Sequence, residues 1–167
     1  HDRIGKLLSE SDKHTPEGMA QLQLDWYDPH AAARLPQLLE GVASDYNTCA
    51  TILSQWDFES QIDDVGASVW AVFQGELIKE LLRDDFNEEE LSFYLAAVIA
   101  GRSVLDAQWH QFTDNPQQVV RQSLDTTCSK LTAQLGEDAS QWTWGRLHRL
   151  QLKHPFAEGT DMLSKWN

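Results

Sequence analysis

Basic side chains are scarce in this sequence. Lysine and arginine total 13 of 167 residues, against 26 aspartates and glutamates, so the formal net charge is −13 at pH 7. A protein with that field repels phosphate backbones and anionic lipid surfaces. Long apolar runs are also lacking, because uncharged segments such as 91–101 are far too short to cross a bilayer. We therefore expect neither a nucleic acid nor a membrane as a partner.

Motifs with known chemistry are lacking too. The sequence has no glycine-rich phosphate loop, and no GxSxG turn that would present a nucleophilic serine. The adjacent carboxylates Asp63–Asp64 and Asp84–Asp85 would diverge on a helix, so we interpret them as solvated helix ends rather than acid/base pairs. The residues alone therefore predict no catalytic and no substrate-binding residue.

The sequence also lacks a set of histidines that could hold a metal ion. His148 and His154 lie six residues apart and would share one face of a strand, which a metal site could use, and His110 stands beside Trp109. No third ligand lies at a helical or loop spacing from them, so we interpret all three histidines as structural or solvent-exposed. We predict no metal-ligating residue in this segment.

Cysteine occurs only twice, at Cys49 and Cys128, without a CxxC pair or a zinc-binding spacing. The simpler interpretation is two small buried hydrophobic residues. The alternative is a single disulfide, which depends on the redox compartment rather than on the sequence.

What the chain does have is enough apolar material for one core. Apolar residues make up 41% of the sequence, including seven tryptophans and six phenylalanines. At this length, with no repeat and no low-complexity linker, we predict a single mostly helical domain over residues 1–167. The expected fold class is mainly α, with six to eight helices.

Helical patterns fill the chain to about residue 136. Three segments open with a capping residue followed by proline, at Thr15–Pro16, Asp28–Pro29 and Asn115–Pro116. Asn87 and Glu90 match a capping box ahead of an apolar stripe. A long helix is predicted ahead of Asn87 by a further apolar stripe, which consists of Val69, Val72, Phe73, Leu77 and Leu81.

The segment 141–157, QWTWGRLHRLQLKHPFA, differs from the rest. After Trp142 the apolar period shifts towards two, which predicts a short strand at about 147–153. Its tryptophans could stack on a sugar or an aromatic ligand, but tryptophans in a helical protein more often belong to the core. A lone strand leaves its N–H and C=O groups unpaired, so we expect the segment to pair with a second copy, as a homodimer, or to fold back across its own helices.

Four motifs, in order along nearly the whole chain, resemble landmarks of the penicillin acylase (penicillin amidase) family. They are an Arg-Ile-x-x-Leu-Leu helix, a helix beginning at threonine and continuing to methionine, a Leu-x-x-Trp-Asp corner, and a W-x-W-G-x-x-H segment that runs on to His-Pro. Gly18 and Pro29 depart from the family pattern, at positions that concern packing. The matching residues are Arg3, Ile4, Leu7, Leu8, Thr15, Met19, Leu38, Leu39, Leu53, Trp56, Asp57, Trp142, Trp144, Gly145, His148, His154 and Pro155.

The resemblance implies the helical region of the β-subunit of an N-terminal-nucleophile hydrolase, exported to the periplasm. Such an enzyme hydrolyses acyl amides, for example penicillins or acyl-homoserine lactones, with an N-terminal serine whose own amine acts as the base. None of the family's catalytic residues maps onto this segment. We therefore expect a scaffold fragment with no cofactor of its own, whose partners are the remainder of the α- and β-subunits. The parent's calcium would be bound outside it.

One alternative stands beside this interpretation. The chain could be a free-standing acidic helical domain that uses its tryptophan-bearing surface to bind a basic or hydrophobic protein. A self-cleavage junction upstream of the segment would favour the enzyme, and an initiator methionine just before His1 would favour the interaction domain.

Overall fold

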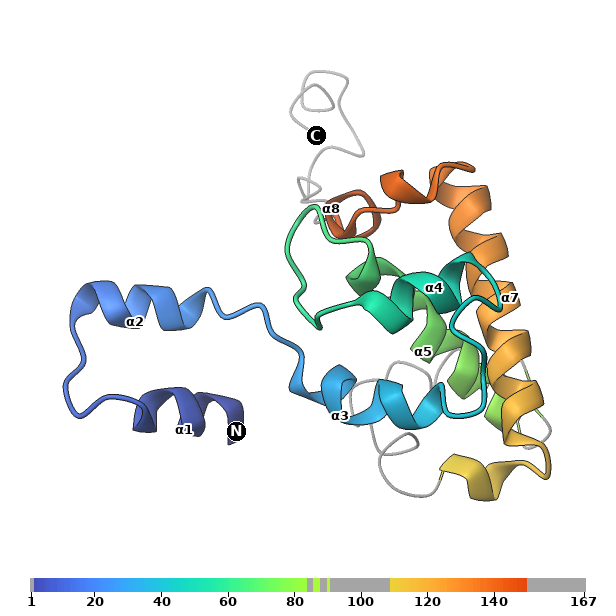
Figure 1. The fold of residues 1–167 in the computed structure, drawn as a ribbon, viewed down its shortest axis with the longest axis horizontal. Helices are drawn as coiled ribbons and strands as arrows, with labels where there is room; N and C mark the ends of the chain where they lie inside the picture. The colour runs from blue at the N-terminus through green and yellow to red at the C-terminus, as the bar shows by residue number, and fades with distance from the viewer. Residues whose placement is uncertain (1, 84–85, 88–89, 91–108, 150–167) are drawn as a thin grey trace, which may run out of the picture.

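The computed structural model describes residues 2–83, 86–87, 90 and 109–149, and these are mainly helical (Figure 1). The mainly α fold predicted from the sequence is confirmed. The described elements are α1 (Asp2–Ser9), α2 (Pro16–Gln23), α3 (Pro29–Leu38), α4 (Thr48–Gln55), α5 (Gly66–Leu82), η2 (Trp109–Phe112), α7 (Pro116–Leu135), η3 (Ala139–Gln141) and α8 (Trp144–Leu147).

Helices α2, α3 and α7 begin where a capping side chain satisfies N–H groups of the first turn. Thr15, Asp28 and Asn115 each accept a backbone hydrogen bond in the first turn, and each is followed by a proline whose missing N–H costs nothing there. Asn87 and Glu90 accept hydrogen bonds reciprocally from each other's backbone N–H, both at 3.0 Å, so the predicted capping box forms. Residues 91–98 of that predicted helix lie outside the described residues.

Helix α5 forms the centre of a helical body. It is apolar on most of its surface, and it packs against α4 on one side and α7 on another (Figure 1). Phe73 and Leu77 of α5, Leu53 of α4, and Leu124 and Leu131 of α7 are all buried. Burying each such side chain stabilises the fold by roughly 1.5–3 kcal/mol, so this three-helix contact is the main source of stability.

Helices α1 and α2 form an arm that projects from this body (Figure 1). No residue of α2 is buried. The Arg3 guanidinium donates to both carboxylate oxygens of Asp25, at 2.8 and 2.7 Å, and also lies 4.9 Å from the centre of the Tyr27 ring. These contacts fix α1 against the end of the arm, where the chain returns to the body.

The loop between α4 and α5 forms backbone hydrogen bonds with the segment that follows α2. Tyr27 and Glu59 form an isolated antiparallel bridge, flanked by bonds from Asp28 N to Phe58 O and from Ser60 N to Trp26 O. The strand predicted at 147–153 was wrong at its start, because the N–H of Leu147 bonds back to Thr143 O and makes it the last residue of α8, and His148 and Arg149 belong to no strand. Residues 150–153 of that prediction lie outside the described residues.

Candidate functional site

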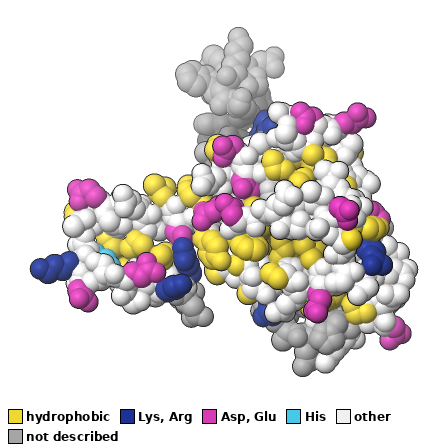
Figure 2. Space-filling view, in the orientation of Figure 1, with side chains coloured by type: hydrophobic (Ala, Val, Ile, Leu, Met, Phe, Trp, Pro, Cys, Tyr) yellow, Lys and Arg dark blue, Asp and Glu magenta, His cyan; other side chains and the backbone are white. Residues whose placement is uncertain are grey.

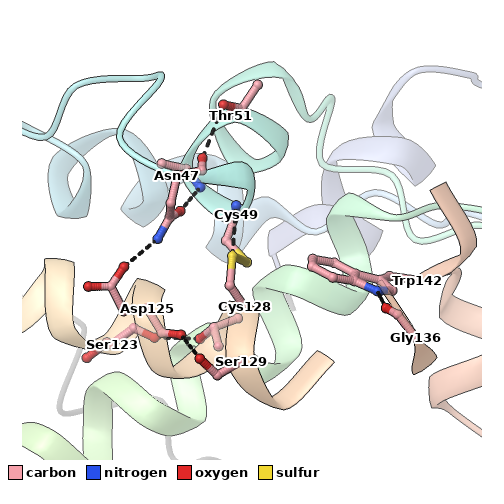
Figure 3. The surroundings of a disulfide bond; sticks show 11 residues. Asn47, Cys49, Thr51, Ser123, Asp125, Cys128, Ser129, Gly136 and Trp142 are labelled. Carbon is pink, nitrogen blue, oxygen red and sulfur yellow. Dashed lines mark hydrogen bonds between the residues drawn. A yellow bond between two sulfur atoms is a disulfide. The ribbon is translucent and has the colours of Figure 1, made fainter. Parts of the chain in front are cut away.

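The most elaborate polar cluster in the described part of the chain surrounds a disulfide between Cys49 of α4 and Cys128 of α7 (Figure 3). Their Cα atoms are 5.8 Å apart, and the Cys49 N–H also donates to Cys128 Sγ at 3.1 Å. The preferred interpretation from the sequence, two unlinked hydrophobic cysteines, was wrong. The pairing depends on how α4 packs on α7, and a separation of 79 residues gives no sign of that packing.

Asp125 of α7 ties the start of α4 to the same place. Its carboxylate accepts hydrogen bonds from Asn47 Nδ2 and from Tyr46 Oη, both at 2.8 Å (Figure 3 shows the Asn47 bond). The hydrogen bond to the Asp125 carboxylate raises the pKa of the Tyr46 hydroxyl. Asn47 uses its other amide atom to cap α4, accepting from Ala50 N. The cluster thus positions one helix end on the neighbouring helix.

The serine and threonine hydroxyls of α7 near this cluster donate to the backbone. Ser123, Thr127 and Ser129 each donate to the carbonyl four residues earlier in α7, at 2.7–2.8 Å. A nucleophilic hydroxyl needs a general base in hydrogen-bond contact. The arrangement joins and orients helices, and the protons of these three hydroxyls are already donated to backbone carbonyls.

Of the three histidines considered as metal ligands, His148 has a described side chain. His148 stacks on the Trp144 ring, with centroids 4.7 Å apart and planes within 2° of parallel. His110 lies in η2, its side chain outside what the structure describes, and His154 is also outside the described residues. Within the ranges that are described, no three His, Cys, Asp or Glu side chains converge.

Of the two pairs of adjacent carboxylates, the structure describes Asp63–Asp64. Asp64 accepts a hydrogen bond from Ala67 N at 2.7 Å and so assists the start of α5. Burial raises the pKa of this carboxyl, and the backbone hydrogen bonds oppose that shift. Asp63 is exposed, and Asp84–Asp85 lie outside the described residues. A capping role, rather than acid/base chemistry, accounts for Asp64.

The two tryptophans of the C-terminal segment have different surroundings. Trp142 is buried, and its indole N–H donates to Gly136 O at 2.7 Å. Trp144 is half-buried, and its backbone N–H donates to Asp64 O, also at 2.7 Å. The sequence favoured core positions for these tryptophans, which Trp142 occupies, but it did not predict the contact of Trp144 with the 60–64 loop. Gly145 was a signal for it, because an added Cβ there would meet Ile62.

Comparison with known proteins places the chain beside a family of enzymes. The model of the family described as penicillin amidase matches residues 1–166. No curated protein and no solved structure matches the chain. In the residues that the structure describes, no helix has the length and apolar character needed to cross a membrane.

Proposed function

The chain belongs to the penicillin amidase family, a family of hydrolases, and from that premise we propose that it forms scaffold in an enzyme that hydrolyses acyl amides. The proposed substrates are compounds such as penicillins or acyl-homoserine lactones. The observation that supports this is the family match over residues 1–166 together with the order of the four motifs.

The scaffold role is supported by how the described polar side chains are used. Serine hydroxyls that form hydrogen bonds in the described ranges donate to backbone carbonyls or, for Ser140, to Asp138. Asp28, Asn47 and Asn115 cap helices. Because an acyl-transfer site needs a nucleophile, a base and oxyanion donors in one place, we propose that the parent's catalytic groups lie outside this segment.

The arm supports the proposal that the partners are other parts of the parent's α- and β-subunits. A groove of about 320 Å³ runs between α1 and α2, lined mainly by Ile4, Leu7, Leu8, Met19 and Leu22. Ile4 is 65% exposed, and Figure 2 shows apolar side chains gathered on the arm. Apolar surface of this kind is typical of contacts with another protein segment.

The disulfide supports the proposal that the protein is exported to an oxidising compartment such as the periplasm. A bridge between two packed helices persists there, whereas cytosolic reductants keep most thiols reduced. The calcium that the family resemblance implies is proposed to bind elsewhere in the parent.

Two assays test the proposed function. We expect the parent protein to release the acyl group from a penicillin or an acyl-homoserine lactone, and the purified 167-residue chain to release none. Turnover by the pure chain that is lost on unfolding would place an active site inside it. A parent with no activity on any acyl amide would overturn the substrate class.

A further inference from the structure

A groove of about 730 Å³ lies where the base of the arm, the loop between α4 and α5, and α8 meet. Two tryptophans line it, Trp26 from the arm and Trp144 from α8, together with Ile62 from the loop. Trp26 is 50% exposed and Ile62 is 77% exposed. Neither the caps nor the core described above accounts for these exposed apolar side chains.

The walls of this groove are held by the backbone of a single loop. Ser60 N donates to Trp26 O at 3.0 Å on one side, and on the other Gly145 N donates to Ile62 O at 2.7 Å. The loop therefore fixes the spacing of the two backbone segments that carry the indoles. Preformed concave sites of this kind lose little conformational entropy when they bind.

The lining of the groove includes one arginine, Arg149. The net charge is −13, yet no carboxylate lies among the described residues that line the groove. Arg149 is at its rim, exposed, and forms neither an ion pair nor a hydrogen bond with any residue in the described ranges. By contrast, the guanidinium of Arg146, in α8, donates hydrogen bonds to Gln141 O and Leu135 O.

The stacked His148 extends the aromatic surface on the same side. Its ring lies parallel to Trp144 and lines the groove beside Arg149. Flat aromatic faces favour planar rings, and a guanidinium that is always charged favours a carboxylate through paired N–H donors.

We propose that this groove, between Trp26, Trp144 and Arg149, is a binding site for small aromatic carboxylates. The ring would lie against the indoles, and the carboxylate would accept hydrogen bonds from Arg149. This site is separate from the acyl-transfer function and does not depend on it.

Titration of the 167-residue chain with 2-naphthoate tests the proposal, with the indole N–H signals of its tryptophans followed by NMR. We expect saturable shifts at Trp26 and Trp144. The neutral analogue 2-naphthylmethanol should bind about fivefold more weakly, and acetate should produce no shift. Equal affinity for the neutral analogue would overturn the proposal, because the groove would then bind the ring without recognising the carboxylate.

Two variants locate the site. Arg149→Gln should weaken 2-naphthoate about fivefold and leave 2-naphthylmethanol unchanged, and Trp26→Ala should weaken both at least about fivefold. Arg83→Gln, the same change on an exposed arginine at the end of α5, should leave both affinities unchanged. The far-ultraviolet circular dichroism of each variant checks that the helices persist. Unchanged binding in both groove variants, or no saturable binding to the wild type, would overturn the proposal.

Discussion

Two carboxylates in the helical body, Asp125 and Glu76, each accept hydrogen bonds from two side chains. The carboxylate of Glu76 in α5 pairs with two ammonium groups. Its Oε1 lies 3.1 Å from Lys79 Nζ, in the same helix, and 2.7 Å from Lys130 Nζ of α7. Its side chain is only 12% exposed. Burial alone would raise the pKa of Glu76, but the two ammonium groups outweigh it and hold the pKa below its ordinary value. Glu76 therefore contributes stability only while it is ionised.

Replacing Glu76 by Gln should lower the free energy of unfolding by about 1 kcal/mol at neutral pH, since both lysines keep partly exposed positions. The folded-state pKa is depressed, so this stability is fully present above the ordinary value of 4.5 and is lost as the pH falls through the folded pKa. Urea unfolding at a series of pH values should show the difference between wild type and Glu76→Gln shrinking below pH 4.5.

Glu80→Gln provides the matched control. In the part of the chain that the structure describes, Glu80 pairs with Arg83, the residue that follows α5, and the Arg83 side chain is 64% exposed. Its removal should cost less than about 0.5 kcal/mol at any pH. A larger loss than for Glu76→Gln would contradict the ranking of the two ion pairs.

On the scale of elements, two glycines of α5 differ in their surroundings: Trp56 packs directly against Gly66, whereas the space beside Gly75 is open. A Cβ on Gly66, at the first turn, would fall on the ring of Trp56, which is itself fixed by a hydrogen bond from its indole N–H to Glu59 O at 2.8 Å. A Cβ on Gly75, in the interior of the same helix, would meet nothing within 4 Å. The loop after α4 can fold over the start of α5 only while residue 66 lacks a side chain.

Gly66→Ala should therefore destabilise the protein by about 1–3 kcal/mol through overpacking against Trp56. Gly75→Ala should be neutral or stabilise it by up to about 1 kcal/mol, because alanine loses less backbone entropy in a helix. Thermal unfolding followed by circular dichroism compares the two. A loss of stability in both variants would show that α5 tolerates no side chain at either position.

The elements themselves were largely predictable, because their signals are local. Capping residues before prolines, and the box at Asn87 and Glu90, mark helix starts through atoms at most three residues apart. The disulfide and the contact of Trp144 with the 60–64 loop could not be predicted in this way, because both depend on tertiary packing across about 80 residues of chain. Sequence pattern specifies which face of a helix is apolar but not which distant residue lies against it.

On the scale of the whole molecule, the disulfide closes a large loop that contains α5. Cys49 and Cys128 are 79 residues apart, so in the loop-closure account the bridge removes a great deal of freedom from the unfolded chain. The α4, α5 and α7 packing and the bridge thus stabilise the same body.

The variant with both cysteines changed to serine should lose about 4 kcal/mol of unfolding free energy relative to the oxidised wild type. Urea denaturation with and without dithiothreitol measures this loss. The reductant should move the midpoint of the wild type towards that of the variant and leave the variant unaffected. Equal midpoints for reduced and oxidised wild type would show that the bridge adds no stability.

The same bridge changes what a peptide-bond cut would do to the chain. A protease that hydrolyses one bond anywhere between Cys49 and Cys128 divides the polypeptide but leaves both pieces joined through sulfur. The nicked protein would run as one species on a non-reducing gel and as two after reduction. Because the bridge keeps α4 and α7 attached to each other, the body can survive such a cut as a two-chain molecule.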